Sequence, residues 1–192
     1  MTLNDFSTLV REARSHRRYD HAATITRDAV IQLIDAARNV PSAMNSHPLR
    51  YRIVTDPEEC DGIFECTTWT KGLRTGPAPS PQERPGAWIV IISTPTQIDP
   101  GIDVGIAAQT INLAAAAAGY RTCMLLSIDR AKIRQVLKLP VDARIELLMS
   151  VGKPGETVVI EELTPASQLP YWRTPDQVHH VPKRKLEDVL IG

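Results

Sequence analysis

The fold is decided by residues 87–94, whose sequence is Ala87-Trp-Ile-Val-Ile-Ile-Ser-Thr94. A continuous apolar run of strand length is typical of a central strand that is covered on both faces. We therefore predict that this run lies in the middle of a sheet. Other apolar runs predict strands at 51–55, 121–127 and 145–151, and a short strand-like piece lies at 158–160.

Helices are predicted on both sides of this run in the sequence. The clearest helix has Thr26 as its N-cap and Asp28 in its first turn, and it ends before Pro41. A short helix is expected up to about Arg14, and another is expected over 129–139. The alanine-rich segment 102–118 has small residues on every face and ends at a glycine. It should be a helix that is buried against other elements on several sides.

The composition is that of an ordinary folded domain. The chain has 192 residues, of which 43% are hydrophobic and 23% charged, and its net charge is zero. No overall field therefore draws it to nucleic acid or to an anionic membrane. The three cysteines show no Cys-x-x-Cys spacing, and the sequence has neither a basic leader nor an apolar run of about 18 residues. We expect one domain, 1–192, in a soluble protein of the reducing cytoplasm.

Several familiar signatures are missing from the sequence. The ten glycines form neither Gly-x-Gly-x-x-Gly nor a Walker loop, which disfavours a dinucleotide or ATP cradle made by the backbone. No His-Glu-x-x-His motif occurs, and the adjacent His179 and His180 should point in different directions, so no metal site is predicted. No Gly-x-Ser-x-Gly elbow occurs either, and no side chain is predicted to act as a nucleophile.

Positive charge is concentrated in two clusters. The first basic cluster is Arg14-Ser15-His16-Arg17-Arg18, and the second basic cluster is Lys183-Arg184-Lys185. Charge runs usually face water, and a basic tail can also touch RNA, so each cluster taken singly is explained without a small ligand. Two guanidinium groups and a hydroxyl within one turn also suit a phosphate, which carries about −1.5 to −2 charges. In that second interpretation the two clusters meet on one anion.

A further candidate is the 41–48 loop, Pro41-Ser42-Ala43-Met44-Asn45-Ser46-His47-Pro48. Ser and Asn beside proline are common in a capped turn, which is the simpler interpretation. In the functional interpretation, Ser42, Asn45 and His47 bond the edge of a flat heterocycle. The loop alone does not decide between the two.

Together these elements resemble, in their order, the nitroreductase family of FMN-dependent oxidoreductases. Residues 14–19 are similar to the family pattern of a basic residue, Ser, any residue, Arg, any residue and an aromatic. Residues 41–49 are similar to its Pro-Ser-x-x-Asn-x-Gln-Pro-Trp segment. Residues 103–109 resemble the start of its central helix, and 183–189 resemble its basic C-terminal signature. The likeness covers nearly the whole chain.

The resemblance implies an α+β fold, namely an α/β/α sandwich with a mostly antiparallel central sheet, in an intertwined homodimer. Each of two FMN sites would be lined by both chains. Residues 164–192 would be a C-terminal extension that reaches the partner subunit. Residues 75–85, with four prolines, are expected to be an exposed loop or a lid. Small residues all round the helix at 102–118 suit close packing at a dimer core.

The resemblance also implies which residues bind FMN. The predicted set is Arg14, Ser15, Arg17, Pro41, Ser42, Asn45, His47, Leu126, Ser127, Lys183 and Arg184. The two basic clusters would hold the phosphate and ribityl chain, and because both chains line each site, the two clusters of one site could come from different subunits. Arg17 would approach the N1 and C2-carbonyl edge. The 41–48 loop would address the pyrimidine edge, and backbone N–H groups at 126–127 would face N5.

The implied activity is ping-pong hydride transfer from NADH or NADPH to a nitroaromatic, a quinone, an enone or another flavin. His47 and Leu49 stand where the family usually has Gln and Trp, and these departures concern the substrate more than the flavin. Two other functions stay open: a flavin-binding or sensing protein without turnover, and a nucleic-acid-associated module. Neutral charge and 5% aromatic residues argue against the second.

Overall fold

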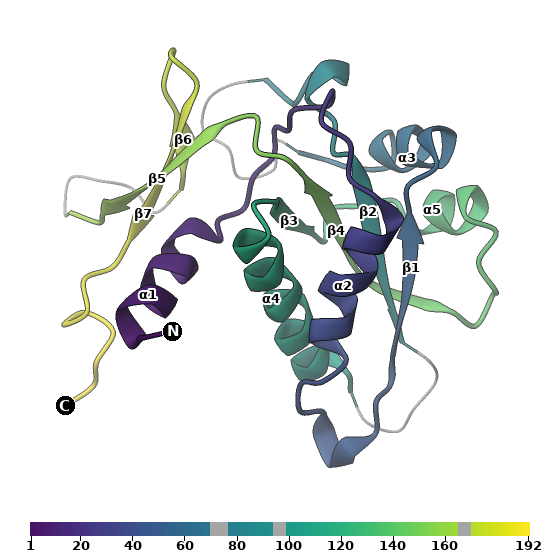
Figure 1. The fold of residues 1–192 in the computed structure, drawn as a ribbon, viewed down its shortest axis with the longest axis horizontal. Coiled ribbons are helices and arrows are strands. Elements are labelled where there is room, and N and C mark those ends of the chain that lie inside the picture. The colour runs from purple at the N-terminus through teal and green to yellow at the C-terminus, as the bar shows by residue number, and fades with distance from the viewer. Residues whose placement is uncertain (70–76, 94–98, 165–169) are drawn as a thin grey trace.

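The computed structural model describes residues 1–69, 77–93, 99–164 and 170–192. It contains two sheets, with helices packed on the larger one (Figure 1). The helices are α1 (Leu3–Glu12), α2 (Arg27–Ala37), α3 (Pro57–Phe64), α4 (Gly101–Ala117) and α5 (Arg130–Val136), with 3-10 turns η1 (Ala43–Asn45) and η2 (Pro81–Glu83). The strands are β1 (Leu49–Val54), β2 (Ala87–Ser93), β3 (Arg121–Leu125), β4 (Arg144–Gly152), β5 (Thr157–Glu162), β6 (Trp172–Arg173) and β7 (Val178–Lys183). No helix in these ranges is long and apolar enough to cross a membrane.

The larger sheet is antiparallel throughout and has the strand order β1-β2-β4-β3. All residues of β2 are buried, and β2 pairs with β1 on one side and with β4 on the other. The predicted central strand is therefore confirmed as far as Ser93, while Thr94 lies outside the described residues. In this order β1 and β3 form the two opposite edges of the sheet.

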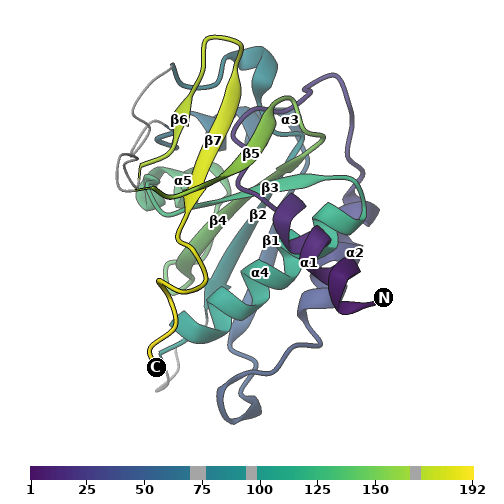
Figure 2. The same ribbon diagram turned by 90° about the vertical axis from the view of Figure 1, so that its left-hand side faces the viewer.

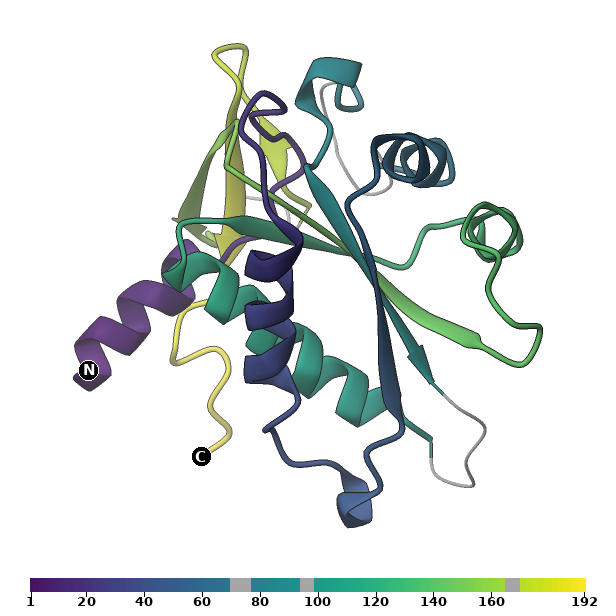
Figure 3. The same cartoon turned by 45° about the vertical axis from the view of Figure 1, so that its right-hand side comes forward.

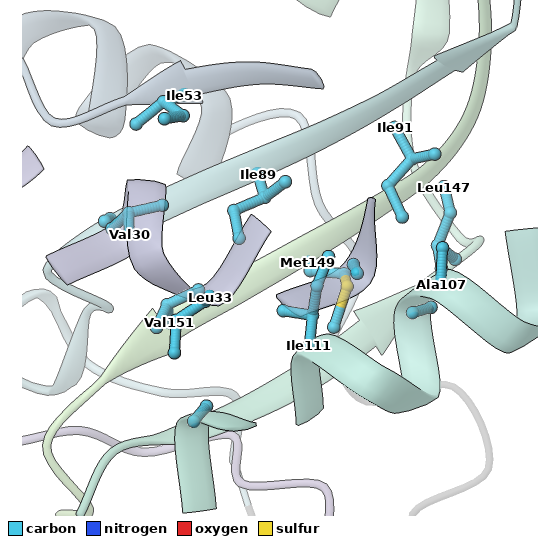
Figure 4. Close-up of a cluster of buried hydrophobic side chains, with 14 of the residues drawn as sticks. Val30, Leu33, Ile53, Ile89, Ile91, Ala107, Ile111, Leu147, Met149 and Val151 are labelled. Carbon is cyan, nitrogen blue, oxygen red and sulfur yellow. The ribbon is translucent and has the colours of Figure 1, made fainter. Parts of the chain in front are cut away.

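Two apolar layers hold the helices onto this sheet. One layer lies between the sheet and α2 with α4, and the other contains α3 and α5 side chains, Ile63 and Ile133 among them, against the opposite face. Figure 3 shows these helix pairs on the two sides of the sheet. Figure 4 shows the first layer with the side chains of Val30, Leu33, Ile53, Ile89, Ile91, Ala107, Ile111, Leu147, Met149 and Val151. Each fully buried Leu or Ile contributes about 1.5–3 kcal/mol. The predicted α/β/α sandwich is confirmed.

Helix α4 is covered on only part of its circumference in this chain. Its buried residues are Asp103, Ala107, Ala108, Ile111, Asn112, Ala115 and Ala116. Ile102 is 78% exposed and Ile106 is 37% exposed, and no atom lies within 4 Å of a Cβ built on Gly105. The predicted burial on several sides is confirmed in that α4 packs against α1, α2, β3 and β4, but the N-terminal part of the helix is open on one side in a single chain. The predicted end of the helix is correct, because Gly119 has φ +74°, which favours glycine.

A second, smaller sheet was not predicted. Strand β7 pairs in parallel with β5 and antiparallel with β6 (Figure 2). Only a short strand at 158–160 and a polar tail were predicted here, because the Val-His-His-Val-Pro-Lys sequence of β7 has no continuous apolar run. Residues 172–173 and 178–183 thus pair within their own chain. The reach of 164–192 to a partner stays a prediction, and 165–169 lie outside the described residues.

Two further details differ from the predictions. Helix α3 was missed, although Asp56 caps it and Pro57 begins it, both of which are standard start signals. Two elements are shorter than predicted: β3 ends at Leu125, and α5 ends at Val136. Both elements end a few residues before the turn that follows them. For α5, that turn contains Pro140.

Candidate functional site

The first basic cluster lies along β3. Ser15 forms an isolated parallel bridge with Thr122, and the backbone N–H of His16 donates to the carbonyl of Thr122 at 3.0 Å. This pairing extends the β3 edge of the sheet by a short stretch of chain. The Ser15 side chain is exposed there, beside the buried thiol of Cys123. Burial raises the pKa of Cys123, which disfavours its thiolate form.

Arg14 carries a partly buried positive charge that pairs with no carboxylate of the described residues. One Nη donates to the carbonyl of Val10 at 2.8 Å. The Nε is buried and has no hydrogen-bond partner among the described residues. Burial lowers the pKa of Arg14, and no charged group contributes to that change. A half-desolvated guanidinium with a free donor is suited to bind an anion.

The other two arginines of this cluster are already engaged. Arg18 pairs with Glu83 at 2.9 Å, so residues 77–85 pack against the cluster through η2. The remainder of the predicted 75–85 loop, residues 75–76, lies outside the described residues. The guanidinium of Arg17 lies over the ring of Tyr171 at 4.5 Å from its centroid, and one of its nitrogens is 3.4 Å from His179 Nε2. Its predicted approach to a flavin edge stays a prediction.

The end of β3 provides two backbone donors. The N–H groups of Leu126 and Ser127 have no hydrogen-bond partner in the part of the chain that the structure describes, whereas the Ser127 carbonyl accepts from Thr68 N–H at 2.9 Å. Leu126 is 65% exposed. Four residues of strand separate Thr122 from Leu126, so these donors lie about 13 Å along β3 from Ser15. The predicted N5-facing amides are therefore on the same sheet edge as the first basic cluster.

The 41–48 loop holds three residues in the left-handed backbone region. Met44, Asn45 and His47 have φ values of 52°, 54° and 45°. The side chains of Asn45 and His47 contact each other, with 2.7 Å between Oδ1 and Nε2, and the His47 N–H donates to Ser42 Oγ at 3.1 Å. Non-glycine residues in this region cost free energy and cluster at functional sites. The strain supports the functional interpretation of the loop over the simple capped turn.

A carboxylate on α4 anchors this loop. Asp103 Oδ1 accepts the N–H of Ala43 at 3.0 Å, and Asp103 is only 3% exposed. Its Oδ2 is buried without a hydrogen-bond partner among the described residues. Asp103 lines a cavity of about 180 Å³ together with Ser42 and His47. Asp103 was not among the predicted site residues, although its place in the first turn of a predicted helix was evident from the sequence.

One chain does not bring the 41–48 loop to the first basic cluster. The loop leads into β1, whereas the first basic cluster lies beside β3. These two strands form the opposite edges of the sheet. Along α4 the loop contacts Asp103, whereas the end of α1 contacts Asn112, whose Nδ2 donates to the Ala13 carbonyl at 3.1 Å. Nine helical residues correspond to about 14 Å. Figures 1 and 3 show η1 and the chain after α1 at different ends of the molecule.

The second basic cluster follows β7 at the surface. Lys183 and Arg184 are exposed, and Lys185 pairs with Glu162 at 3.2 Å. Figure 2 shows β7 and the chain after it on the same side of the molecule as α1. No hydrogen bond or ion pair joins the two basic clusters within the described ranges. Their meeting on one anion stays a prediction.

Comparisons with known proteins agree on one family. The model of the nitroreductase family matches residues 10–70 and 96–153. YdgI of Bacillus subtilis, whose name describes an NAD(P)H nitroreductase, is 22% identical over 88% of this chain and 98% of its own. DrgA of Synechocystis is 24% identical over 77% of this chain and 83% of its own.

Solved structures show the same fold. A nitroreductase in complex with FMN from Desulfovibrio desulfuricans has a TM-score of 0.70 at 21% identity and covers 100% of this chain and 98% of its own. An FMN-dependent nitroreductase from Clostridium difficile has a TM-score of 0.63 at 25% identity, over 77% of this chain and 87% of its own. The match of the family model over more than half of the sequence shows that this chain belongs to the nitroreductase family.

Proposed function

We propose that this protein is an FMN-dependent oxidoreductase that transfers hydride from NADH or NADPH to a small conjugated acceptor, such as a nitroaromatic, a quinone, an enone or another flavin. Its family supports this, as do the FMN and NAD(P)H in the descriptions of its relatives. The three cysteines are all free thiols, which suits the predicted reducing cytoplasm.

The proposal rests chiefly on the surroundings of the Arg14 guanidinium. Its guanidinium is partly buried, and within the part of the chain that the structure describes its Nε has no hydrogen-bond partner and no carboxylate pairs with it. The exposed hydroxyl of Ser15 follows it directly. A buried charge without a partner has an unfavourable desolvation free energy. An anionic ligand bound at this position would offset that energy. The FMN phosphate fits these donors, with Lys183 and Arg184 as the predicted additional cations.

The remaining predicted ligands would orient the flavin. Bound FMN supplies the hydride chemistry, and the protein supplies position and electrostatics. The free N–H groups of Leu126 and Ser127 would donate near N5. Arg17 is the predicted donor to the N1 and C2-carbonyl edge, and the ring of Tyr171 orients its guanidinium. A hydrogen bond to a charged group is worth about 1.5–3 kcal/mol.

We further propose that the active form is a homodimer in which each site takes its 41–48 loop from the partner. The loop and the first basic cluster lie on opposite edges of the sheet, so a complete site needs a second copy. The uncovered side of α4 offers Ile102 and Ile106, and the C-terminal residues Leu190 and Ile191 are 66% and 102% exposed. Apolar surface of this kind is typical of a subunit interface.

The absorption spectrum of the purified protein tests the function directly. We expect the bands of oxidised flavin, and we expect them to bleach under anaerobic conditions when NADH or NADPH is added and to return with an acceptor. A yellow protein that oxidises no nicotinamide with any acceptor would instead indicate a flavin-binding protein without turnover. A colourless protein that takes up no FMN would contradict the proposal.

A double variant tests the phosphate assignment. Arg14→Ala with Arg184→Ala should weaken FMN binding about 100-fold, because each lost charge-assisted hydrogen bond accounts for roughly a factor of ten. Titration with FMN, followed by quenching of flavin fluorescence, measures the affinity. Arg11→Ala with Arg27→Ala is the matched control, since both arginines are exposed and the total charge change is equal. Equal affinities in the two double variants would contradict the assignment.

A further inference from the structure

A buried carboxylate holds the first basic cluster in place. The backbone N–H groups of Arg17 and Arg18 both donate to Glu156 Oε1, the second at 3.1 Å. The Arg18 carbonyl in turn accepts from Gly155 N–H at 3.0 Å. A Cβ built on Gly155 would lie 2.5 Å from the carbonyl carbon of Tyr19, so only glycine permits this close approach. The cluster is thus fixed to the turn that precedes β5.

The same carboxylate pairs with the second sheet. Glu156 Oε2 lies 2.5 Å from Arg173 Nη2, and the two side chains are 1% and 3% exposed. Arg173 belongs to β6, where it stands opposite His179 of β7. Strand β7 ends at Lys183, which begins the second basic cluster. One ion pair therefore links the backbone of the first basic cluster to the small sheet whose strand β7 leads into the second basic cluster.

Stability alone does not explain this ion pair. A fully buried ion pair typically contributes no more stability than well-packed apolar side chains of similar volume, because both charges lose their hydration. Its best-attested use is to fix a relative arrangement that apolar packing leaves free to slide. Here the pair fixes strand β6, from the C-terminal region, relative to the backbone of residues 17–18, from the N-terminal region.

We propose that the Glu156–Arg173 pair is a positioning device that sets the place of Lys183 and Arg184 relative to Arg14 and Ser15, so that both clusters reach one phosphate. This inference rests on the proposed function, because the phosphate is that of FMN. Neither member of the pair needs to touch the cofactor. Their effect is transmitted through the backbone of 17–18 on one side and through β6 and β7 on the other.

Riboflavin supplies the discriminating measurement, because it has the same ring system as FMN and no phosphate. Glu156→Gln keeps an oxygen that accepts the two backbone N–H bonds and removes the charge that holds Arg173. We expect the ratio of FMN to riboflavin affinity to fall about tenfold in this variant, with riboflavin affinity nearly unchanged. A general loss of structure would weaken both ligands together. Arg173→Lys provides a second variant, in which the ratio should also fall, should Glu156→Gln fail to fold.

The control is Glu59→Gln, which breaks the pair between Glu59 and Arg52, at 2.8 and 2.9 Å, away from both clusters. This variant should keep the wild-type ratio. An unchanged ratio in folded Glu156→Gln, or a parallel loss of both affinities, would overturn the inference while the function stands. A wild-type protein that binds FMN no better than riboflavin would instead contradict the proposed phosphate site itself.

Discussion

His179 shows how one buried side chain makes this protein sensitive to pH. It is 1% exposed, and its Nδ1 has no hydrogen-bond partner among the described residues. Burial lowers the pKa of His179 from 6.5 to about 4; Glu156 opposes this change, and Arg17, Arg173 and His16 add to it. The folded protein therefore holds this imidazole neutral at pH values where the unfolded chain protonates it.

The sign of the effect follows from proton binding. Between about pH 6.5 and pH 4 the unfolded chain binds one proton more than the folded chain at this residue, so the free energy of unfolding falls as the pH falls. The full loss is about 3 kcal/mol for a change of this size. Urea unfolding at fixed protein concentration across this range should show it, and His179→Gln should reduce the slope. The pKa of buried His16 is also lowered, so some slope should remain.

The exposed His21 gives the matched control for this experiment. His21→Gln changes the same chemical group at the surface, and it should leave the pH dependence of unfolding close to that of the wild type. The same slope in His179→Gln and the wild type would show that His179 does not carry the effect.

At the scale of elements, the contact between the 41–48 loop and α4 sets the shape of one half of the site. Asp103→Ala removes the acceptor for Ala43 N–H. We expect a loss of about 1 kcal/mol in unfolding free energy and a weaker FMN affinity, because the left-handed residues Met44, Asn45 and His47 are then less constrained. Asp103→Asn keeps an amide oxygen at the same place and should retain most of both properties. Equal defects in Ala and Asn variants would show that the charge, rather than the hydrogen bond, is what the site needs.

The elements also show what the sequence could predict. A run such as 87–94 has one plausible structure, because its length and apolar character require burial on both faces. Strand β7 could not be found in this way, since the burial of His179 depends on tertiary contacts, with Tyr171 and with Arg17, which is 162 residues away in the sequence. The role of Asp103 likewise depends on a hydrogen bond across 60 residues. The roles of Glu156 and Arg173 could not be predicted either, because they too depend on tertiary contacts. Local motifs such as 14–18 and 41–48 were recognisable from the sequence.

At the scale of the whole molecule, the exposed side of α4 is the proposed dimer interface, and a complete site requires the dimer. Ile102→Glu with Ile106→Glu places two charges on that side and should yield a monomer, because charges at a close apolar interface are strongly unfavourable. Size-exclusion chromatography with light scattering measures the mass. Val141→Glu is the control, since Val141 is 91% exposed on the turn before β4. A wild-type protein that is itself monomeric would contradict the dimer.

Mixed dimers test whether each site is shared between subunits. One partner carries Arg14→Ala with Arg184→Ala, and the other carries Asn45→Ala with His47→Ala. If a site takes its basic clusters from one subunit and its 41–48 loop from the other, the mixed dimer has one intact site and one site with both defects. FMN binding by the isolated mixed dimer should then return to about half of the wild-type stoichiometry, although neither parent binds well. If each site belonged to a single chain, mixing would restore nothing, since every chain would still carry one defect.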